Sequence, residues 1–137
     1  MWRATAAADL ADFNAIHCSS VERCIAVSEG GGTAHVWQTE NGGASWSRTF
    51  TDLDAGASLI GARFHAHDEL EGWVAGGVGS GGSMEGRFWH TTDGGRSWEL
   101  GGVVADAIGT SLSLAGPARG YAGCITRFQV STLCYLA

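Results

Sequence analysis

Apolar residues in this sequence come in short runs, separated by polar or glycine-rich clusters. This pattern predicts short β-strands joined by tight turns. Only the stretch 4–12, ATAAADLAD, has the composition for one or two helical turns. We therefore expect an all-β fold of antiparallel strands.

The predicted strands repeat along the chain in rows of four. The first row contains FNAIHC (13–18), CIAVSE (24–29), AHVWQT (34–39) and SWSRTF (45–50). The second row contains LIGARFHA (59–66), GWVAGG (72–77), RFWHTT (87–92) and SWELGG (97–102). A third, incomplete row contains GTSLSLA (109–115), GYAGCIT (120–126) and RFQVST (127–132).

A repeat of roughly 50 residues with four strands per row is typical of β-propeller blades. We expect one domain over residues 1–137, with blades at about 10–50 and 59–102 and a partial blade at about 108–134. A single blade cannot bury both faces of its sheet, so neighbouring blades must stack and share a core. Because rings take about four to eight blades, we expect these to leave apolar faces for further blades or a second copy.

The turn between the third and fourth strands has nearly the same sequence in both complete rows. WQTENGGASW spans 37–46 and WHTTDGGRSW spans 89–98. Glycines allow the sharp reversal, an Asp or Asn side chain accepts hydrogen bonds from turn N–H groups, and the closing Trp packs between sheets. These residues match the Asp-box, or BNR, motif, and we interpret them as a structural staple: Thr39, Asn41, Gly43, Ser45, Trp46, Thr91, Asp93, Gly95, Ser97 and Trp98.

The rows as a whole resemble a narrower group. CIAVSEGGGTAHVWQTENGGASW and GWVAGG with GRFWHTTDGGRSWEL are similar to repeats of the Ycf48/HCF136-like family of photosystem II stability and assembly factors. Residues 10–102 carry the resemblance, and 103–132 follow it weakly because the third row lacks its Asp-box. The resemblance implies propeller blades and a non-catalytic role in binding another protein. At about 45 residues per blade, the chain supplies fewer blades than the seven-bladed rings of that family.

Charge and hydropathy exclude several classes of partner. The net charge is −6, with eight basic residues that are all arginine. A nucleic-acid partner requires a concentrated positive field, so we expect no nucleic-acid binding. No apolar run approaches the roughly 20 residues of a membrane span, so we expect no membrane-spanning segment. The glycine-rich stretch GVGSGG (77–82) precedes a predicted strand rather than a helix, and we interpret it as a flexible hairpin loop rather than a dinucleotide site.

Four cysteines form two local pairs, Cys18 with Cys24 and Cys124 with Cys134. Neither pair has zinc-knuckle or redox spacing. Each pair flanks a predicted turn, so each is either a hairpin disulfide of an oxidising compartment or two buried thiols. If the disulfides and the resemblance hold, a thylakoid-lumen or other extracytoplasmic location follows. His65 and His67 share a strand face beside acids, but no third ligand follows from the spacing, and we expect no metal or cofactor.

Two functions remain after these exclusions. The first is a non-catalytic protein-binding or scaffolding module, with another protein or further blades as partner. The second is a carbohydrate-active protein, because Asp-boxes also occur in sialidases. Sialidase chemistry needs an arginine cluster and a tyrosine nucleophile, whereas the two tyrosines, Tyr121 and Tyr135, lie in or near the incomplete row. The acids of the loops 52–54 and 68–71 are expected to be solvated or to face a basic partner. We therefore expect no enzyme.

Overall fold

The computed structural model describes residues 12–66, 68–80, 83–116, 119–126 and 131–136, and each of the eleven elements in this part of the chain is a strand. The all-β fold expected from the sequence is confirmed. Most of the stretch 4–12, for which the sequence predicted helical turns, lies outside the described residues, as does the start of the first expected blade at residue 10.

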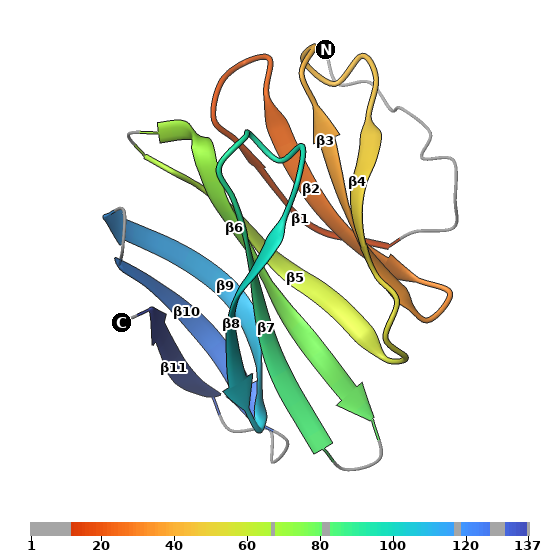
Figure 1. Ribbon diagram of the computed structural model, residues 1–137, viewed down its shortest axis with the longest axis vertical. Coiled ribbons are helices and arrows are strands. Elements are labelled where there is room, and N and C mark those ends of the chain that lie inside the picture. Colours follow the sequence, from red (N-terminus) through yellow and green to blue (C-terminus); the bar gives the residue numbers. More distant parts are fainter. Residues whose placement is uncertain (1–11, 67, 81–82, 117–118, 127–130, 137) are drawn as a thin grey trace.

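The strands form three antiparallel sheets, which Figure 1 shows side by side in chain order. Sheet 1 contains β1 (Asp12–Cys18), β2 (Cys24–Gly30), β3 (Thr33–Thr39) and β4 (Ser47–Asp52). Sheet 2 contains β5 (Ala57–His65), β6 (Asp68–Ser80), β7 (Ser83–Thr91) and β8 (Glu99–Ala105). Sheet 3 contains β9 (Ala107–Gly116), β10 (Arg119–Thr126) and β11 (Ser131–Leu136). Two complete four-stranded blades and part of a third are thus present.

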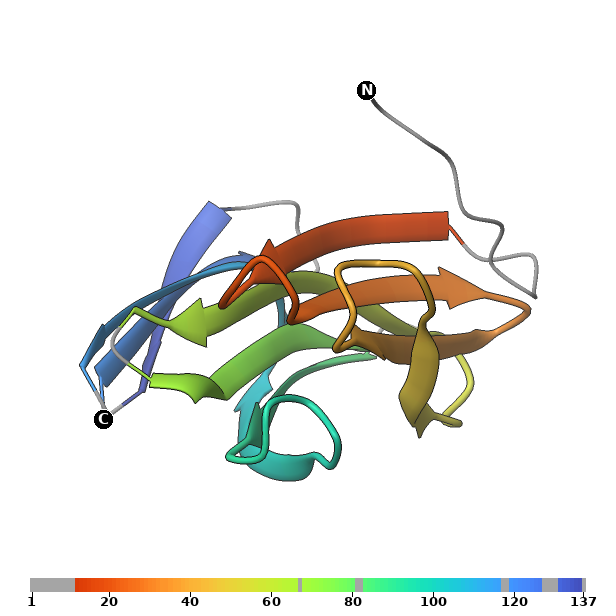
Figure 2. The same cartoon turned by 90° about the horizontal axis from the view of Figure 1, so that it is seen from above.

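The sheets stack through their first strands. β5 contacts both β1 and β9, so the three first strands line one edge of the stack. The fourth strands β4 and β8 lie together on the opposite side, as Figure 2 shows from above. This arrangement, with one strand of each sheet at the axis and one at the outside, is that of neighbouring propeller blades.

The two complete blades have the same register. In sheet 1 the pairing of β3 with β4 shifts between Val36 and Trp37, and in sheet 2 the pairing of β7 with β8 shifts between Phe88 and Trp89. Both shifts lie three residues before the Thr that ends the third strand. Because a bulge increases the local twist of a strand, the repeated bulge turns both fourth strands in the same way.

The core between sheets 1 and 2 is large. It contains the buried side chains Ile25, Val27, Ala34, Val36, Ala57, Leu59, Phe64 and Val74. The rings of Phe50 on β4 and Trp89 on β7 lie 4.4 Å apart, between their centroids, and extend this core. The core between sheets 2 and 3 is built on smaller buried side chains, namely Ala107, Ala122, Cys124 and Cys134. The second interface is therefore less completely filled than the first.

The described strands differ from the expected ones in three places. Residues 77–80 are not in a loop, because β6 and β7 stay paired as far as Ser80 and Ser83, and residues 81–82 lie outside the described residues. A Cβ atom on Gly77 would lie 2.2 Å from the carbonyl oxygen of Glu85, so glycine here permits close pairing of the strands rather than a loop. The acids of 68–71 lie at the start of β6 instead of in a turn. The last described strand, β11, continues past the expected end at residue 132 to Leu136, and residues 127–130 of the expected strand lie outside the described residues.

An ion-pair cluster ties sheet 1 to sheet 2. The Arg87 guanidinium on β7 contacts Asp52 Oδ2 at 2.9 Å, Asp54 Oδ2 at 2.7 Å and Glu85 Oε2 at 2.8 Å. Burial lowers the pKa of Arg87, but hydrogen bonds to Glu85, Asp54 and Asp52 outweigh burial and raise it. Asp52 is 8% exposed and depends on this arginine for its charge compensation.

Replacing Arg87 is expected to loosen the contact between these sheets. Arg87→Ala leaves the Asp52 carboxylate buried without its cation, and we expect the free energy of unfolding to fall by roughly 3 kcal/mol. Chemical denaturation measures this change. The exposed Arg63 on β5 supplies the control, because Arg63→Ala should change stability by only about 0.5 kcal/mol. Equal losses of unfolding free energy in the two variants would contradict this role of Arg87 between sheets 1 and 2.

Candidate functional site

The turn after the third strand is held by one buried hydroxyl in each blade. Thr39 and Thr91 are both 1% exposed. The Thr39 hydroxyl donates to Asn41 Oδ1 at 2.9 Å and accepts from the Gly43 N–H at 2.9 Å. The Thr91 hydroxyl makes the same two bonds, to Asp93 Oδ1 at 2.8 Å and from the Gly95 N–H at 3.0 Å. Each threonine therefore fixes the path of the whole turn.

Asn41 and Asp93 make the same hydrogen bond through Oδ1 but differ at the second atom of the side-chain head group, which is Nδ2 in Asn41 and Oδ2 in Asp93. Asn41 Oδ1 and Asp93 Oδ1 each accept from the N–H of the following serine, Ser45 or Ser97, at 2.9 Å. Asn41 Nδ2 then donates to the Ser45 hydroxyl at 2.8 Å, whereas Asp93 Oδ2 accepts from the Ser97 hydroxyl. The serine hydroxyl rotates to suit either partner, so the first turn works without a charge.

The carboxylate of the second turn is stabilised in its ionised form. Burial alone would raise the pKa of Asp93, but hydrogen bonds from Ser97, Thr91 and the Arg96 backbone lower it to about 2. Hydrogen bonds to a carboxylate favour its charged state, and this effect dominates here.

The Trp that closes the second turn joins the two complete blades. Trp98 Nε1 donates to the Gly95 carbonyl at 3.1 Å and to the Thr49 hydroxyl of sheet 1 at 3.3 Å, and its ring packs on the core between the sheets. Gly95 has a φ of 93°, and a Cβ atom there would lie 2.7 Å from Ile25 of sheet 1. Only glycine satisfies both the turn and this close approach.

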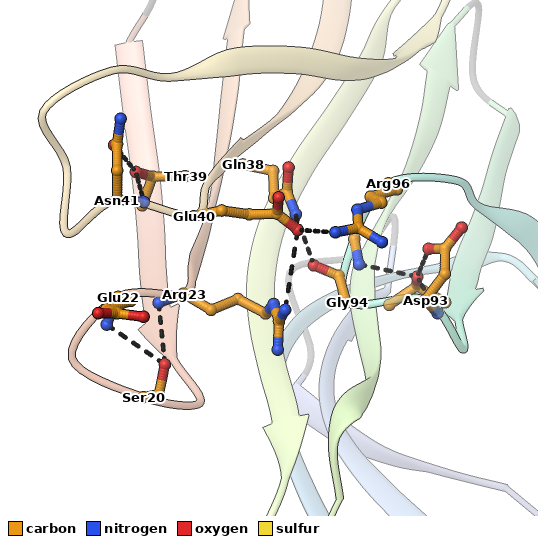
Figure 3. A network of polar contacts seen from close by, with 12 residues as sticks. Ser20, Glu22, Arg23, Gln38, Thr39, Glu40, Asn41, Asp93, Gly94 and Arg96 are labelled. Carbon is orange, nitrogen blue, oxygen red and sulfur yellow. Dashed lines mark hydrogen bonds and ion pairs between the residues drawn. The ribbon is translucent and has the colours of Figure 1, made fainter.

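A polar network joins three turns at one end of these two sheets, and Figure 3 shows it. Glu40 Oε1 lies 2.8 Å from Arg96 Nη2 of the second Asp-box turn and 3.8 Å from Arg23 Nη2 of the turn between β1 and β2. Gln38 Nε2 donates to Glu40 Oε1 at 3.0 Å and to the Gly94 carbonyl at 3.2 Å. We call this surface, formed by the turns 19–23, 40–46 and 92–98, the rim.

Sequence reasoning did not find the rim network. Glu40 and Arg96 occupy positions that the Asp-box motif leaves variable, and their opposite charges in successive repeats were the only signal. Arg96 is 60% exposed and Glu40 is 39% exposed. The hydrogen bond between Glu40 and Arg96 lowers the pKa of Glu40 and raises the pKa of Arg96. The rim is therefore a charged surface with both signs present.

An apolar pocket lies between sheets 2 and 3. It encloses about 120 Å³, and its lining contains only apolar, aromatic and glycine residues and one disulfide cysteine: Trp73, Phe88, Gly101, Gly102, Val103, Val104, Leu112, Leu114, Gly120, Tyr121, Ala122, Cys134 and Tyr135. Glycoside hydrolysis normally requires a pair of carboxylates, or a tyrosine with acidic and arginine partners. The pocket has no acidic or basic lining residue, so it does not fit this chemistry.

The structure joins the four cysteines in their local pairs, Cys18 with Cys24 and Cys124 with Cys134. Cys18 and Cys24 are direct partners across β1 and β2, at the end of that hairpin. Cys124 and Cys134 lie diagonally across β10 and β11, because Cys134 pairs with Ala122. Each disulfide therefore stays within one sheet.

The remaining candidate residues that the structure describes make contacts with other residues of the fold. The acids Asp52 and Asp54 contact Arg87, and Glu71 Oε1 lies 3.1 Å from His90 Nε2. The ring of His90 stacks on Trp73 with centroids 4.3 Å apart. His67, the possible partner of His65, lies outside the described residues. Within the described part of the chain, no group of three or more His, Cys, Asp or Glu side chains is placed to hold a metal ion.

These strands, bulges and turns define a set of β-propeller blades, and a solved structure shares the fold. The structure titled "YCF48 bound to D1 peptide" superposes with a TM-score of 0.60 at 21% sequence identity, over 90% of this chain and 37% of that chain. This chain thus spans about a third of its neighbour's length. No family model matches the chain. No curated protein matches it either.

No described element is a helix suited to crossing a bilayer.

The two parts of the staple are expected to differ in importance. Trp98→Ala removes a ring from the interface between sheets 1 and 2 and should lower the free energy of unfolding by roughly 3 kcal/mol. Asp93→Ala removes hydrogen bonds within a single turn and should lower it by roughly 1–2 kcal/mol. Denaturant titration of the two variants gives the ranking. The reverse order would show that the turn, not the ring, controls stacking.

The Asp93 carboxylate should make the protein sensitive to acid. Because the folded pKa, about 2, lies below the ordinary value of 3.8, the stabilisation is complete above about pH 4 and is lost as the pH falls toward 2. Asp93→Asn reproduces the neutral turn of Asn41 and should lose less thermal stability over that interval than the wild type. Melting temperatures at pH 5 and pH 2.5 measure the difference. Parallel losses in both proteins would contradict this assignment.

Proposed function

We propose that this chain is a non-catalytic protein-binding module of propeller blades, and that the rim is its contact surface. The observation that carries the proposal is the polar network, in which turns from two blades are held in a fixed relation while Arg96 stays 60% exposed. Rigid strands that present exposed loops are a common way to build a binding surface. The likeness to a propeller chain solved with a bound peptide supports this role.

The rim suits a peptide that carries a carboxylate. Two guanidinium groups, those of Arg23 and Arg96, flank the single carboxylate of Glu40. Exposed ion pairs contribute only about 0–1 kcal/mol, so exchanging Glu40 for a carboxylate of a partner costs little. A bidentate carboxylate contact then adds both affinity and orientation.

The neighbouring structure suggests a narrower partner. That structure is of YCF48 bound to a D1 peptide, and the sequence resemblance to photosystem II assembly factors points to the same class of partner. We therefore infer that a D1-type segment, or another carboxylate-bearing peptide of a protein under assembly, is the ligand. The match covers 37% of the neighbouring chain, so most of that chain has no counterpart among these residues.

The carbohydrate-active alternative has less support. The Asp-box residues hold turns here, and the lining of the apolar pocket has no carboxylate. Trp37 and Trp73, which a sugar-binding surface would expose, are 7% and 9% exposed. Trp37 donates its Nε1–H to the Ser28 hydroxyl at 2.8 Å and is part of the blade.

Titration calorimetry with the D1 peptide tests the proposal. The wild type should bind, Arg96→Ala should weaken binding several-fold, and Glu40→Gln should strengthen it because it frees both arginines. Arg63→Ala, at an exposed position of β5 outside the three rim turns, is the control. The proposal is wrong if the wild type fails to bind, or if Arg96→Ala and Glu40→Gln change the affinity in the same direction.

A further inference from the structure

The two disulfides differ in how far solvent reaches them. Cys124 and Cys134 are 2% and 7% exposed and belong to the core between sheets 2 and 3. In the other pair Cys24 is 8% exposed, but Cys18 is exposed at the end of β1. A thiolate breaks a disulfide only if it reaches one of the two sulfur atoms. The bond between Cys18 and Cys24 is therefore open to attack through Cys18, whereas the core shields the other bond.

The accessible disulfide closes one of the three turns of the rim. Cys18 and Cys24 flank the turn 19–23 directly, and Cys24 follows Arg23 in the chain. The two cysteines are also the last register pair of β1 and β2, so no further pair of these strands joins the ends of the turn. Within the turn, the Ser20 hydroxyl accepts from the Arg23 N–H at 3.0 Å, as Figure 3 shows. The base of the turn thus depends on the disulfide and on hydrogen bonds within the turn.

Contacts from this turn reach both Asp-box turns. The Glu22 carbonyl accepts from the Gly42 N–H of the first Asp-box turn at 3.0 Å. The Arg23 side chain lies against the second Asp-box turn, because a Cβ atom on Gly94 would lie 2.9 Å from Arg23 Nε. Arg23 Nη2 is 3.8 Å from Glu40 Oε1. The position of the disulfide-closed turn therefore sets where the Arg23 guanidinium lies relative to Glu40.

Reduction removes the constraint at the base of the turn. A bond holds two sulfur atoms far closer than two unbonded thiol groups can approach. When the bond breaks, the side chains of Cys18 and Cys24 must move apart, and the residues between them gain conformational freedom. The ion pair of Arg23 with Glu40 is partly exposed and 3.8 Å long, and such a pair is too weak to hold the turn in place.

We infer that the disulfide of Cys18 with Cys24 is a redox switch of the rim. In the oxidised state the turn 19–23 is held, and the Arg23 guanidinium is placed beside Glu40. In the reduced state the turn is released, and Arg23 leaves this position. The effect on ligand affinity rests on the proposed function, because Arg23 is one of the two guanidinium groups that flank the proposed carboxylate site. The change in the turn itself does not depend on any ligand.

The switch operates by thiol–disulfide exchange with a dithiol reductant. A thiolate of the reductant attacks Cys18 Sγ, a bond forms between these two sulfur atoms, and the bond to Cys24 Sγ breaks, so that Cys24 leaves as a thiolate. The second thiol of the reductant then attacks the reductant's own sulfur in the mixed disulfide and releases the Cys18 thiolate. The reductant ends as a disulfide, and its two electrons and two protons have passed to the two cysteine thiols.

Timed alkylation tests the selectivity of reduction. The oxidised protein is treated with dithiothreitol, a small dithiol, and the thiols are trapped with iodoacetamide and mapped by mass spectrometry. Cys18 and Cys24 should be labelled about tenfold faster than Cys124 and Cys134, because the core shields the second pair. Equal rates, or faster labelling of Cys124 and Cys134, would overturn the inference.

Amide hydrogen exchange tests whether the bond holds the turn. The Cys18→Ser/Cys24→Ser variant cannot form the bond. Its Gly42 amide, which donates to the Glu22 carbonyl, should exchange about tenfold faster than in the oxidised wild type. The Gly95 amide of the second Asp-box turn is the internal control and should exchange at an unchanged rate. An unchanged rate at Gly42, or equal acceleration at Gly42 and Gly95, would refute the switch.

Calorimetry with the D1 peptide measures the effect on binding. The Cys18→Ser/Cys24→Ser variant should bind the peptide several-fold more weakly than the oxidised wild type. Cys124→Ser/Cys134→Ser, which removes the disulfide of sheet 3, is the matched control and should leave the affinity unchanged.

The same titrations separate this inference from the proposed function. If the wild type does not bind the peptide while the Gly42 amide still responds to the bond, only the proposed function is wrong. If the oxidised wild type and the Cys18→Ser/Cys24→Ser variant bind with equal affinity, the switch is wrong and the proposed function stands. In an Arg23→Ala background, loss of the disulfide should no longer change the affinity, because the switch acts through Arg23. An undiminished effect in that background would also contradict the switch.

Discussion

A buried threonine hydroxyl at the end of the third strand is the contact on which the blades depend. Thr39 and Thr91 each donate one hydrogen bond and accept another, and together these bonds set the direction of the reversing chain. The fourth strand, the closing Trp and the charged rim residues all follow from that direction. Pairing across β10 and β11 places Leu136 opposite Gly120, as Thr91 lies opposite Gly72. Sheet 3 therefore has an apolar residue where the complete blades have the hydroxyl.

Much of this architecture could be predicted from the sequence, because strand-length apolar runs and two similar decamers carry it directly. The alternation of runs and turns gave the antiparallel sheets, and the Asp-box spacing placed the reversals. The extension of β6 and β7 through glycines was missed, since glycine indicates both turns and close strand pairing and only the register distinguishes them. The position of β11 was missed because the apolar residues of 127–132 and 131–136 give equally good strands. The rim network and the pocket could not be derived, because both arise between residues of different blades.

Sheets 1 and 2 are joined by two kinds of contact that respond to different conditions. The aliphatic core and the Trp98 ring bury apolar surface, and this contribution depends little on salt. The Arg87 cluster and the pair of Glu40 with Arg96 are electrostatic, and the more exposed rim pair is screened more strongly. High ionic strength is thus expected to loosen the rim before it affects the core. The ion pairs of the rim can therefore exchange partners while the core between the two sheets stays intact.

The confinement of each disulfide to one sheet has a consequence for the order of folding. Cys18 and Cys24 are 6 residues apart, and Cys124 and Cys134 are 10 residues apart. Both bonds cross between strands of a single hairpin, so either can form before any sheet has found its neighbour. Hairpins form within microseconds, whereas oxidation of thiols takes seconds or longer. Each hairpin can therefore form with reduced cysteines, and oxidation then fastens the two end sheets, whereas sheet 2 contains no cysteine and depends on its neighbours for its stability.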